Sequence, residues 1–297
     1  MIRKEKENNI LARPRKVVSV LTLRSSEIYF IVSLIHYVSK ISTLHPYPAL
    51  VVDGKWNAKK HKCIAISDLH IGFESDLYSK GINLNLDLIV DEMAKDIINL
   101  TKTQKADSII ILGDLKNTIG SISKEEWEKV PRFLKLVSEF ADVYMIPGNH
   151  DSNIRFLAPN NITMISTSGL VLDDNLFIHG HSMPFSSGSD IKRIIMGHIH
   201  PVFIKRGSTI NGQRVWIYLK VRTEAIWPKT NGILDIIIVP SFNKHLFAMT
   251  ERGYRKTISP LISRVFKYNA IECAMVVTLD GSIIGDTETL RSIIFKN

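Results

Sequence analysis

The sequence predicts an α/β sandwich, and three observations lead to this fold class. Between residues 47 and 201, short apolar runs of strand length alternate with longer segments in which apolar residues recur at a helical period. The chain has 297 residues, of which 45% are hydrophobic, enough for one large core or a core with a small appendage. Glycine, proline and charged residues occur at ordinary frequencies, so most of the chain is expected to be folded.

Residues 1–45 are set apart as an N-terminal extension whose status stays open: it is a tail, an added helix or, if translation starts near Leu44, a segment that the protein does not contain. Residues 1–27 are polar and basic and show no clear period. The apolar stretch Ile28–Val38 is 11 residues long and is interrupted by His36, which makes it too short to span a bilayer. Acidic and polar residues precede it, unlike the arrangement of a signal peptide. We therefore expect no stable membrane insertion.

The main domain is expected over residues 46–297, with its motifs in 66–201 and further strands and loops in 202–297. Short apolar runs bounded by turn residues predict strands in both parts. The predicted strands are Ala49–Val52, Cys63–Ile66, Ser108–Leu112, Tyr144–Ile146, Leu170–Leu172, Leu176–Ile178, Ile191–Met196, Val215–Val221, Ile233–Val239 and Ala274–Leu279. Tight turns are predicted at Asp53-Gly54 and Asp280-Gly281.

Two helices are predicted from apolar periodicity, at Asn85–Lys102 and Ser123–Phe140. The second begins with a capping-box pattern, in which Ser123 is the N-cap and Glu126 follows three residues later. No further alternation of helices and strands is obvious beyond Pro201, so that region is expected to complete the sheets and add loops.

The net charge of +9 is unevenly distributed, because basic ends flank an acidic middle. Such a pattern suits a metal site that receives a phosphate, but an ordinary lysine-rich surface explains it equally well. The two cysteines do not form a disulfide framework, and Cys63 is expected to be a small buried hydrophobe. This sparse cysteine usage is typical of a reducing, cytoplasmic setting.

Five apolar runs end directly in residues that can bind metals. The five segments are Ser67-Asp68-Leu69-His70, Gly113-Asp114-Leu115-Lys116-Asn117, Gly148-Asn149-His150-Asp151, His179-Gly180-His181 and Gly197-His198-Ile199-His200. Each one alone is weak support, since such residues also form ordinary turns. Five in succession, each after a predicted buried strand, indicate a site at the ends of the strands, where open α/β sheets bind their ligands.

The spacing within these segments has a chemical reason. In Asp68-x-His70 and His198-x-His200, residues two apart in an extended chain point to the same side. Glycines before Asp114, Asn149, His181 and His198 allow sharp turns and a close approach to ions. Mixed carboxylate, imidazole and amide ligands suit divalent ions such as manganese, iron or zinc. The absence of a thiolate cluster in the sequence argues against a structural zinc site.

The ordered set of motifs resembles the calcineurin-like metallophosphoesterase superfamily over about residues 48–201. The resemblance implies a four-layer α/β/β/α sandwich with two mixed sheets. The segments His179-Gly180-His181, Gly197–Pro201 and Val239–Asn243 further resemble a prokaryotic branch of predicted phosphoesterases that includes ligase-associated DNA-damage-response phosphoesterases. Asn117 departs from that pattern, because relatives often have histidine there, and its role stays open.

The resemblance also implies a role for each motif residue. Two divalent ions are expected, with manganese as the first choice and iron, zinc and nickel as alternatives. The first ion would be bound by Asp68, His70 and His200, the second by Asn149, His181 and His198, and both by Asp114. A hydroxide bridging the metals would attack phosphorus.

The catalytic pair is expected to be His150 and Asp151. His150 would protonate the leaving alkoxide or steady the developing charge, and Asp151 would hold the His150 ring. His179 has two possible roles: it lies beside the metal site or facing the substrate, or it is a structural histidine. Basic candidates for contacting phosphate are Lys116, Arg155 and the pair Lys192-Arg193.

These residues predict a dinuclear metal-dependent phosphoesterase that cleaves phosphodiester bonds. A nuclease and a nucleotide phosphodiesterase both fit this reading, and the partner is then a nucleic acid or a nucleotide. The sequence shows no array of alternating aromatic and basic residues of the kind that binds single strands. The alternatives are a catalytically silent metal-binding scaffold on the same fold and a phosphomonoesterase. The sequence does not predict the oligomeric state.

Overall fold

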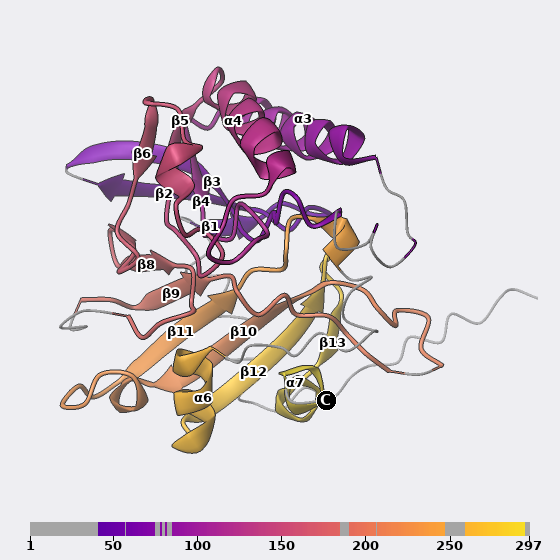
Figure 1. Cartoon of the computed structure of the whole chain (residues 1–297). Coiled ribbons are helices and arrows are strands. Elements are labelled where there is room, and N and C mark those ends of the chain that lie inside the picture. The colour runs from indigo at the N-terminus through magenta and orange to yellow at the C-terminus, as the bar shows by residue number, and fades with distance from the viewer. Residues whose placement is uncertain are drawn as a thin grey trace, which may run out of the picture.

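Two mixed β-sheets face each other and form the centre of the molecule (Figure 1). The computed structural model describes residues 41–56, 58–74, 78, 81, 85–184, 190–205, 207–246 and 259–294. The expectations for residues 1–40, including the apolar stretch Ile28–Val38, lie outside the described residues. Within the described part of the chain, no helix is both long enough and apolar enough to cross a membrane.

The first sheet has the strand order β1-β2-β3-β4-β5-β6. Its strands are β1 (Ile41–Thr43), β2 (Leu50–Trp56), β3 (Lys59–Ile66), β4 (Ser108–Ile111), β5 (Asp142–Met145) and β6 (Ile162–Met164). Strands β3 to β6 run parallel, whereas β1, β2 and β3 are antiparallel neighbours. The parallel half therefore presents the carboxyl ends of β3, β4 and β5 at one edge.

The second sheet has the order β13-β12-β10-β11-β9-β8-β7. Its strands are β7 (Leu170–Leu172), β8 (Asn175–Ile178), β9 (Arg193–Met196), β10 (Val215–Arg222), β11 (Ile233–Ile238), β12 (Ile271–Thr278) and β13 (Ile283–Gly285). Strands β8, β9 and β11 are parallel to one another, and the other pairs are antiparallel.

Helices cover the outer face of each sheet, which completes four layers (Figure 1). Helices α3 (Leu86–Gln104) and α4 (Lys124–Ser138) lie on the first sheet. Helices α6 (Pro260–Lys267) and α7 (Thr287–Ile294) lie on the second. Short 3₁₀ turns occur at η1 (Ile154–Phe156), η2 (Thr223–Ala225) and η3 (Lys244–Leu246). The predicted four-layer sandwich with two mixed sheets is confirmed.

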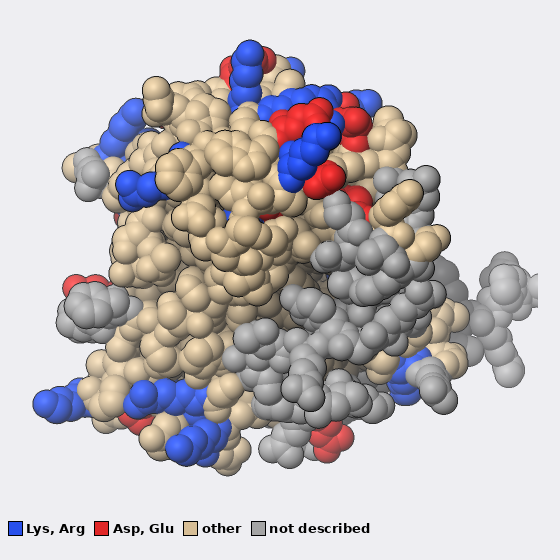
Figure 2. Space-filling view, in the orientation of Figure 1, with Lys and Arg blue, Asp and Glu red and all other residues tan. Residues whose placement is uncertain are grey.

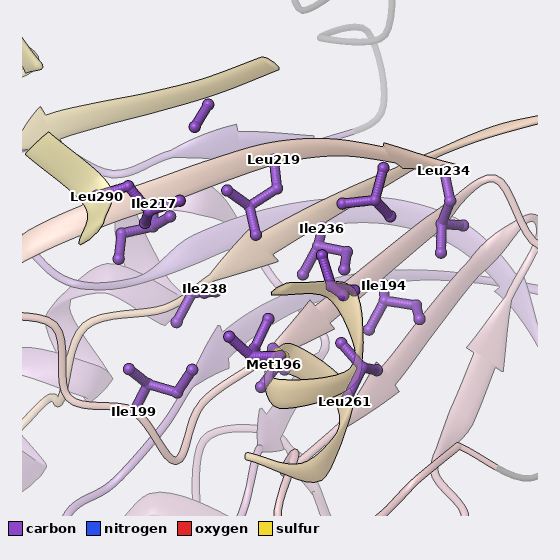
Figure 3. Packing of buried hydrophobic residues seen from close by; sticks show 14 of the residues in the cluster. Ile194, Met196, Ile199, Ile217, Leu219, Leu234, Ile236, Ile238, Leu261 and Leu290 are labelled. Carbon is purple, nitrogen blue, oxygen red and sulfur yellow. The ribbon is translucent and has the colours of Figure 1, made fainter. Parts of the chain in front are cut away.

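Alternation along the strands divides the apolar side chains among three cores, one between each pair of layers. In β4, Ile109 and Ile111 pack under α3 and α4, while Ile110 points between the sheets. The inter-sheet core also contains Cys63, which is buried as predicted. Figure 3 shows the third core, in which Leu261 of α6 and Leu290 of α7 pack near the side chains of the second sheet.

Both predicted helices form, and their caps explain where they begin. Asn85 accepts the Leu88 N–H at the start of α3. At α4 the predicted capping box is confirmed: Ser123 Oγ accepts the Glu126 N–H at 3.1 Å, and Glu126 Oε2 accepts the Ser123 N–H at 2.8 Å.

Two expectations about local structure were wrong. Asp53 and Gly54 do not form a turn, because both lie inside β2, paired with Lys62 and His61 of β3. The region beyond Pro201 also contains the helices α6 and α7, although no helix was obvious there. The turn at Asp280-Gly281 is confirmed and joins β12 to β13.

Candidate metal centre

The predicted ligands lie on loops that follow β3, β4 and β5 in the first sheet and β8 and β9 in the second. Neighbouring parallel strands end at the same edge of a sheet, so these loops lie close together. Hydrogen bonds also join the two sheets at this edge. The His198 N–H donates to Asp68 Oδ2 at 3.0 Å, and His179 Nδ1 donates to the Leu112 carbonyl at 2.7 Å.

A first group of possible metal ligands contains Asp68, His70, Asp114 and His200, whose ligand atoms all lie within 4.8 Å of one another. His200 Nε2 is 3.0 Å from Asp68 Oδ1 and 3.3 Å from His70 Nε2. His70 Nε2 is 3.6 Å from Asp114 Oδ2. The set expected for the first ion therefore comes together, with Asp114 beside it.

A second group contains Asp114, His179 and His198. His179 Nε2 lies 3.2 Å from each of Asp114 Oδ2, Asn149 Oδ1 and His198 Nδ1. Because His179 Nδ1 donates a proton to the Leu112 carbonyl, Nε2 is the ring atom directed at the group. Burial alone would lower the pKa of His179, but Asp114 raises it to about 9, so a bound cation would replace the proton on Nε2. Asp114 belongs to both groups, which is the geometry of a bridging carboxylate.

This second group differs from the expected set at one position, because it contains His179 and not His181. The His181 ring centroid lies 5.3 Å from that of His179 and 6.3 Å from that of His198. In the sequence His-Gly-His, either histidine could have been the ligand. The contact that distinguishes them is the bond from His179 to Leu112, which lies 67 residues earlier in the chain.

The electrostatics of the two groups fit divalent cations. Burial alone would raise the pKa of Asp114, yet the histidines around it, His179 foremost, hold that pKa well below its usual range. Burial lowers the pKa of His70 to about 3, and burial together with His179 lowers that of His198 to about 4. Carboxylates and the neutral imidazoles of His70 and His198 thus face each other in a buried space, and cations among them would relieve the repulsion between their lone pairs.

The backbone at this centre is held in an unusual conformation. Five of the candidate ligands have a positive φ, a region that costs non-glycine residues about 1–3 kcal/mol each. They are Asp68 (57°), His70 (45°), Asp114 (51°), His198 (71°) and His200 (46°). A glycine permits the loops to approach this closely, since a Cβ on Gly197 would lie 2.6 Å from Asp68 Oδ2. Strain of this kind is characteristic of functional sites.

His150 lies against the first group without belonging to it. Its ring meets that of His70 edge to face, with 4.7 Å between centroids, and its Nε2 is 4.0 Å from Asp114 Oδ2. Its backbone N–H donates to Asp114 Oδ1 at 2.8 Å. The other ring nitrogen, Nδ1, donates to the carbonyl of Asn117. Nε2 is therefore the ring atom directed toward the centre.

Asp151 does not hold the His150 ring as expected. Its Oδ1 accepts the backbone N–H groups of Leu115 at 3.0 Å and Lys116 at 3.2 Å, and its Oδ2 accepts that of Gly148 at 2.8 Å. The Asn117 carbonyl, and not Asp151, accepts the hydrogen bond from His150 Nδ1. A backbone group has no sequence signature, which explains why this contact was not predicted.

The structure distinguishes among the basic residues that we predict to contact phosphate. Lys116 is fully buried, and its Nζ donates to the carbonyls of Thr118 and Ser121, so it is engaged away from a substrate. Lys192 and Arg193 lie at the amino end of β9, opposite the ligand loops, near Asp174 and Asn175 respectively. Arg155 is exposed on η1, in the segment that follows His150, and stays a candidate.

Comparison with known proteins agrees with this arrangement. A family model described as calcineurin-like phosphoesterase matches residues 61–211, just over half of the chain. The chain belongs to this family and is a hydrolase of phosphoric esters. No curated protein sequence matches the chain.

Solved structures with weak similarity to the chain include the following two. One is the nuclease MPE of Pseudomonas putida, with 17% identity and a TM-score of 0.46, over 79% of this chain and 100% of that one. The other is YfcE, a phosphoesterase from E. coli, with 17% identity and a TM-score of 0.35, over 76% and 97% respectively.

Proposed function

We propose that the protein hydrolyses phosphodiester bonds with the help of two divalent metal ions. The observation that carries the proposal is the shared carboxylate of Asp114, which lies in both groups of ligand atoms. The proposed ligands are Asp68, His70 and His200 for one ion, Asn149, His179 and His198 for the other, and Asp114 for both. For the ions we propose manganese, with iron, zinc and nickel as alternatives, since all four accept mixed carboxylate, imidazole and amide donors.

In the proposed reaction, different residues of the chain bind the ions, deliver a proton and hold a loop in place. Bound here, two divalent ions would activate water and neutralise the charge on the phosphoryl oxygens. In its doubly protonated form His150 keeps its Nδ1 proton on the Asn117 carbonyl and delivers its Nε2 proton to the departing alkoxide, which leaves the neutral imidazole. Asp151 keeps the loop that carries Asn117 in place through its bonds to Leu115 and Lys116.

We further propose a nucleotide or nucleic-acid substrate, in keeping with the branch of prokaryotic phosphoesterases that the motifs resemble. The distribution of surface charge does not distinguish a nucleotide substrate from a nucleic-acid substrate. On the face in Figure 2, lysine and arginine form separate groups, and those near the top lie beside acidic residues. The pairs Lys129–Asp87, Arg132–Asp87 and Arg132–Asp91 belong to α3 and α4. On the described part of this face, the basic side chains do not form a continuous track.

A substrate panel tests the proposal. Metal-free protein, reconstituted with manganese, iron, zinc or nickel, is assayed on single-stranded DNA, RNA, cyclic nucleotides and p-nitrophenyl phosphate. We expect manganese-dependent cleavage of at least one diester and a loss of about 10²–10⁴-fold in His150→Ala, the range for a general acid.

The control is the metal content of His150→Ala, which should equal that of the unaltered protein because His150 is not a proposed ligand. Hydrolysis of the monoester alone would make the protein a phosphomonoesterase. No hydrolysis with any of these metals would support the metal-binding scaffold.

A further inference from the structure

We propose that Glu126 of helix α4, a residue outside the five motif segments, positions His150 for proton transfer. The inference rests on the proposed role of His150 and adds a residue that the sequence identifies only as part of a helix cap. The two carboxylate oxygens of Glu126 accept hydrogen bonds from different parts of the chain, one from the helix cap and the other from the loop after β4.

The Glu126 carboxylate is fully buried and bonds to three backbone N–H groups. Oε2 accepts the N–H of Ser123 at 2.8 Å and thereby completes the capping box. Oε1 points away from the cap and accepts the N–H groups of Asn117 at 2.9 Å and Thr118 at 2.6 Å. A helix cap needs only the first of these contacts. The second joins α4 to the loop that follows β4.

The contact with Thr118 reaches His150 through a single peptide group. The N–H of Thr118 and the carbonyl of Asn117 belong to the same rigid plane. Glu126 holds one end of this plane, and His150 Nδ1 donates to the other end. Fixing the plane fixes the direction of the carbonyl, and hence the tautomer and the orientation of the imidazole. Nε2 is then left facing the metal centre.

Two further features place the carboxylate accurately. Gly72, in the loop that carries Asp68 and His70, has a φ of 99° and lies against the Glu126 side chain. A Cβ at position 72 would be 2.9 Å from Glu126 Cγ, so the loop can pack here only without a side chain. Lys116 Nζ donates to the Thr118 carbonyl and thereby restrains the same loop.

The test compares two diesters that differ in their leaving group, thymidine 5′-(p-nitrophenyl phosphate) and the dinucleotide thymidylyl-thymidine. An alkoxide needs a proton from a general acid far more than p-nitrophenolate does. We expect His150→Ala to lose at least about 10²-fold more on the dinucleotide than on the nitrophenyl ester. For Glu126→Ala we expect the same selectivity with a smaller excess loss, about tenfold, since the imidazole remains but is misaligned.

Two other variants separate positioning from helix capping. Ser123→Ala removes the other half of the capping box, and it should lower the melting temperature while leaving the ratio of the two rates unchanged. Glu126→Gln should restore most of the dinucleotide rate, because its amide oxygen can still accept both loop N–H groups. The double variant Glu126→Ala/His150→Ala should be no slower on the dinucleotide than His150→Ala alone, since both changes act on one step.

The outcomes are distinguishable. If His150→Ala lacks leaving-group selectivity, the proposed function of His150 fails first. If His150→Ala is selective but Glu126→Ala slows both substrates equally, or adds to the loss in the double variant, Glu126 is a structural cap and the inference is overturned. Should Glu126→Ala not fold, Glu126→Asp provides the same comparison, because its shorter side chain cannot reach the cap and the loop together.

Discussion

A single hydrogen bond at His179 distinguishes the two histidines of the His-Gly-His segment. The Leu112 carbonyl accepts the Nδ1 proton at 2.7 Å, which leaves the Nε2 lone pair for a metal. Among the residues that the structure describes, His181 makes no such contact with the metal groups, and its buried Nδ1 has no hydrogen-bond partner there. Of the two residues, His179 has the geometry of a ligand.

Substituting each histidine tests this assignment. We expect His179→Asn to retain about half of the manganese of the unaltered protein after dialysis, because a lost ligand costs a site at least 10–100-fold in affinity. His181→Asn serves as the matched control and should keep the full content. Metal analysis after dialysis gives the result, and a loss in His181→Asn alone would reverse the assignment.

We expect Glu74 to make the free energy of unfolding depend on pH. It is 3% exposed, and burial raises its pKa from 4.5 to about 7, although the backbone of Gly72 and Glu74 and the Asn243 side chain act against this. The folded state thus binds the proton more tightly than the unfolded state. Its contribution to stability is lost as the pH rises from about 4.5 through 7.

The glutamine side chain in the Glu74→Gln variant cannot ionise, so the variant should not lose stability as the pH rises. Relative to the unaltered protein, the variant should gain up to about 3 kcal/mol between pH 4 and pH 8, at 1.36 kcal/mol for each pKa unit. Urea unfolding in the presence of a chelator measures the difference at each pH. If the difference in unfolding free energy between the two proteins does not change with pH, Glu74 ionises normally.

The sequence could predict most of the candidate site because its side chains follow apolar strands directly. Asp68, His70, Asp114, His198 and His200 all come together as expected. The contacts that orient these residues were harder to predict. The Asn117 carbonyl is a backbone group, and Glu126 reaches the loop only after α4 has packed on the sheet.

At the scale of elements, helix α4 depends on its cap. Ser123 and Glu126 satisfy N–H groups that the first turn would otherwise leave without partners. Ser123→Ala should therefore destabilise the protein by about 1 kcal/mol, within the usual range of 0.5–2 for N-caps. Chemical denaturation measures this, and an unchanged midpoint would show that the cap contributes nothing to stability.

The elements that the sequence did not predict have physical explanations. Helix α6 is eight residues long, and over two turns the burial of Leu261, Ile262 and Val265 gives too little periodicity to identify a helix. The dipeptide Asp53-Gly54 favours a turn locally, but its pairing with β3 extends β2 through it. In both cases tertiary packing decides the outcome.

In the whole molecule, the candidate metal centre draws its side chains from both sheets. Asp68, His70, Asp114 and Asn149 follow strands of the first sheet, whereas His179, His198 and His200 follow strands of the second. Ions bound by both sets would connect the halves of the sandwich at one edge. The inter-sheet core, which contains the fully buried Trp216, holds the same halves together elsewhere.

We propose that two ions, sharing Asp114, enable this protein to hydrolyse phosphodiester bonds. The decisive measurement is a titration of the metal-free protein with manganese while hydrolysis of bis(p-nitrophenyl) phosphate is followed. We expect no activity without metal and a rate that stops rising at two ions per chain. Full activity at one ion per chain, or activity that persists without metal, would rule out a two-metal mechanism.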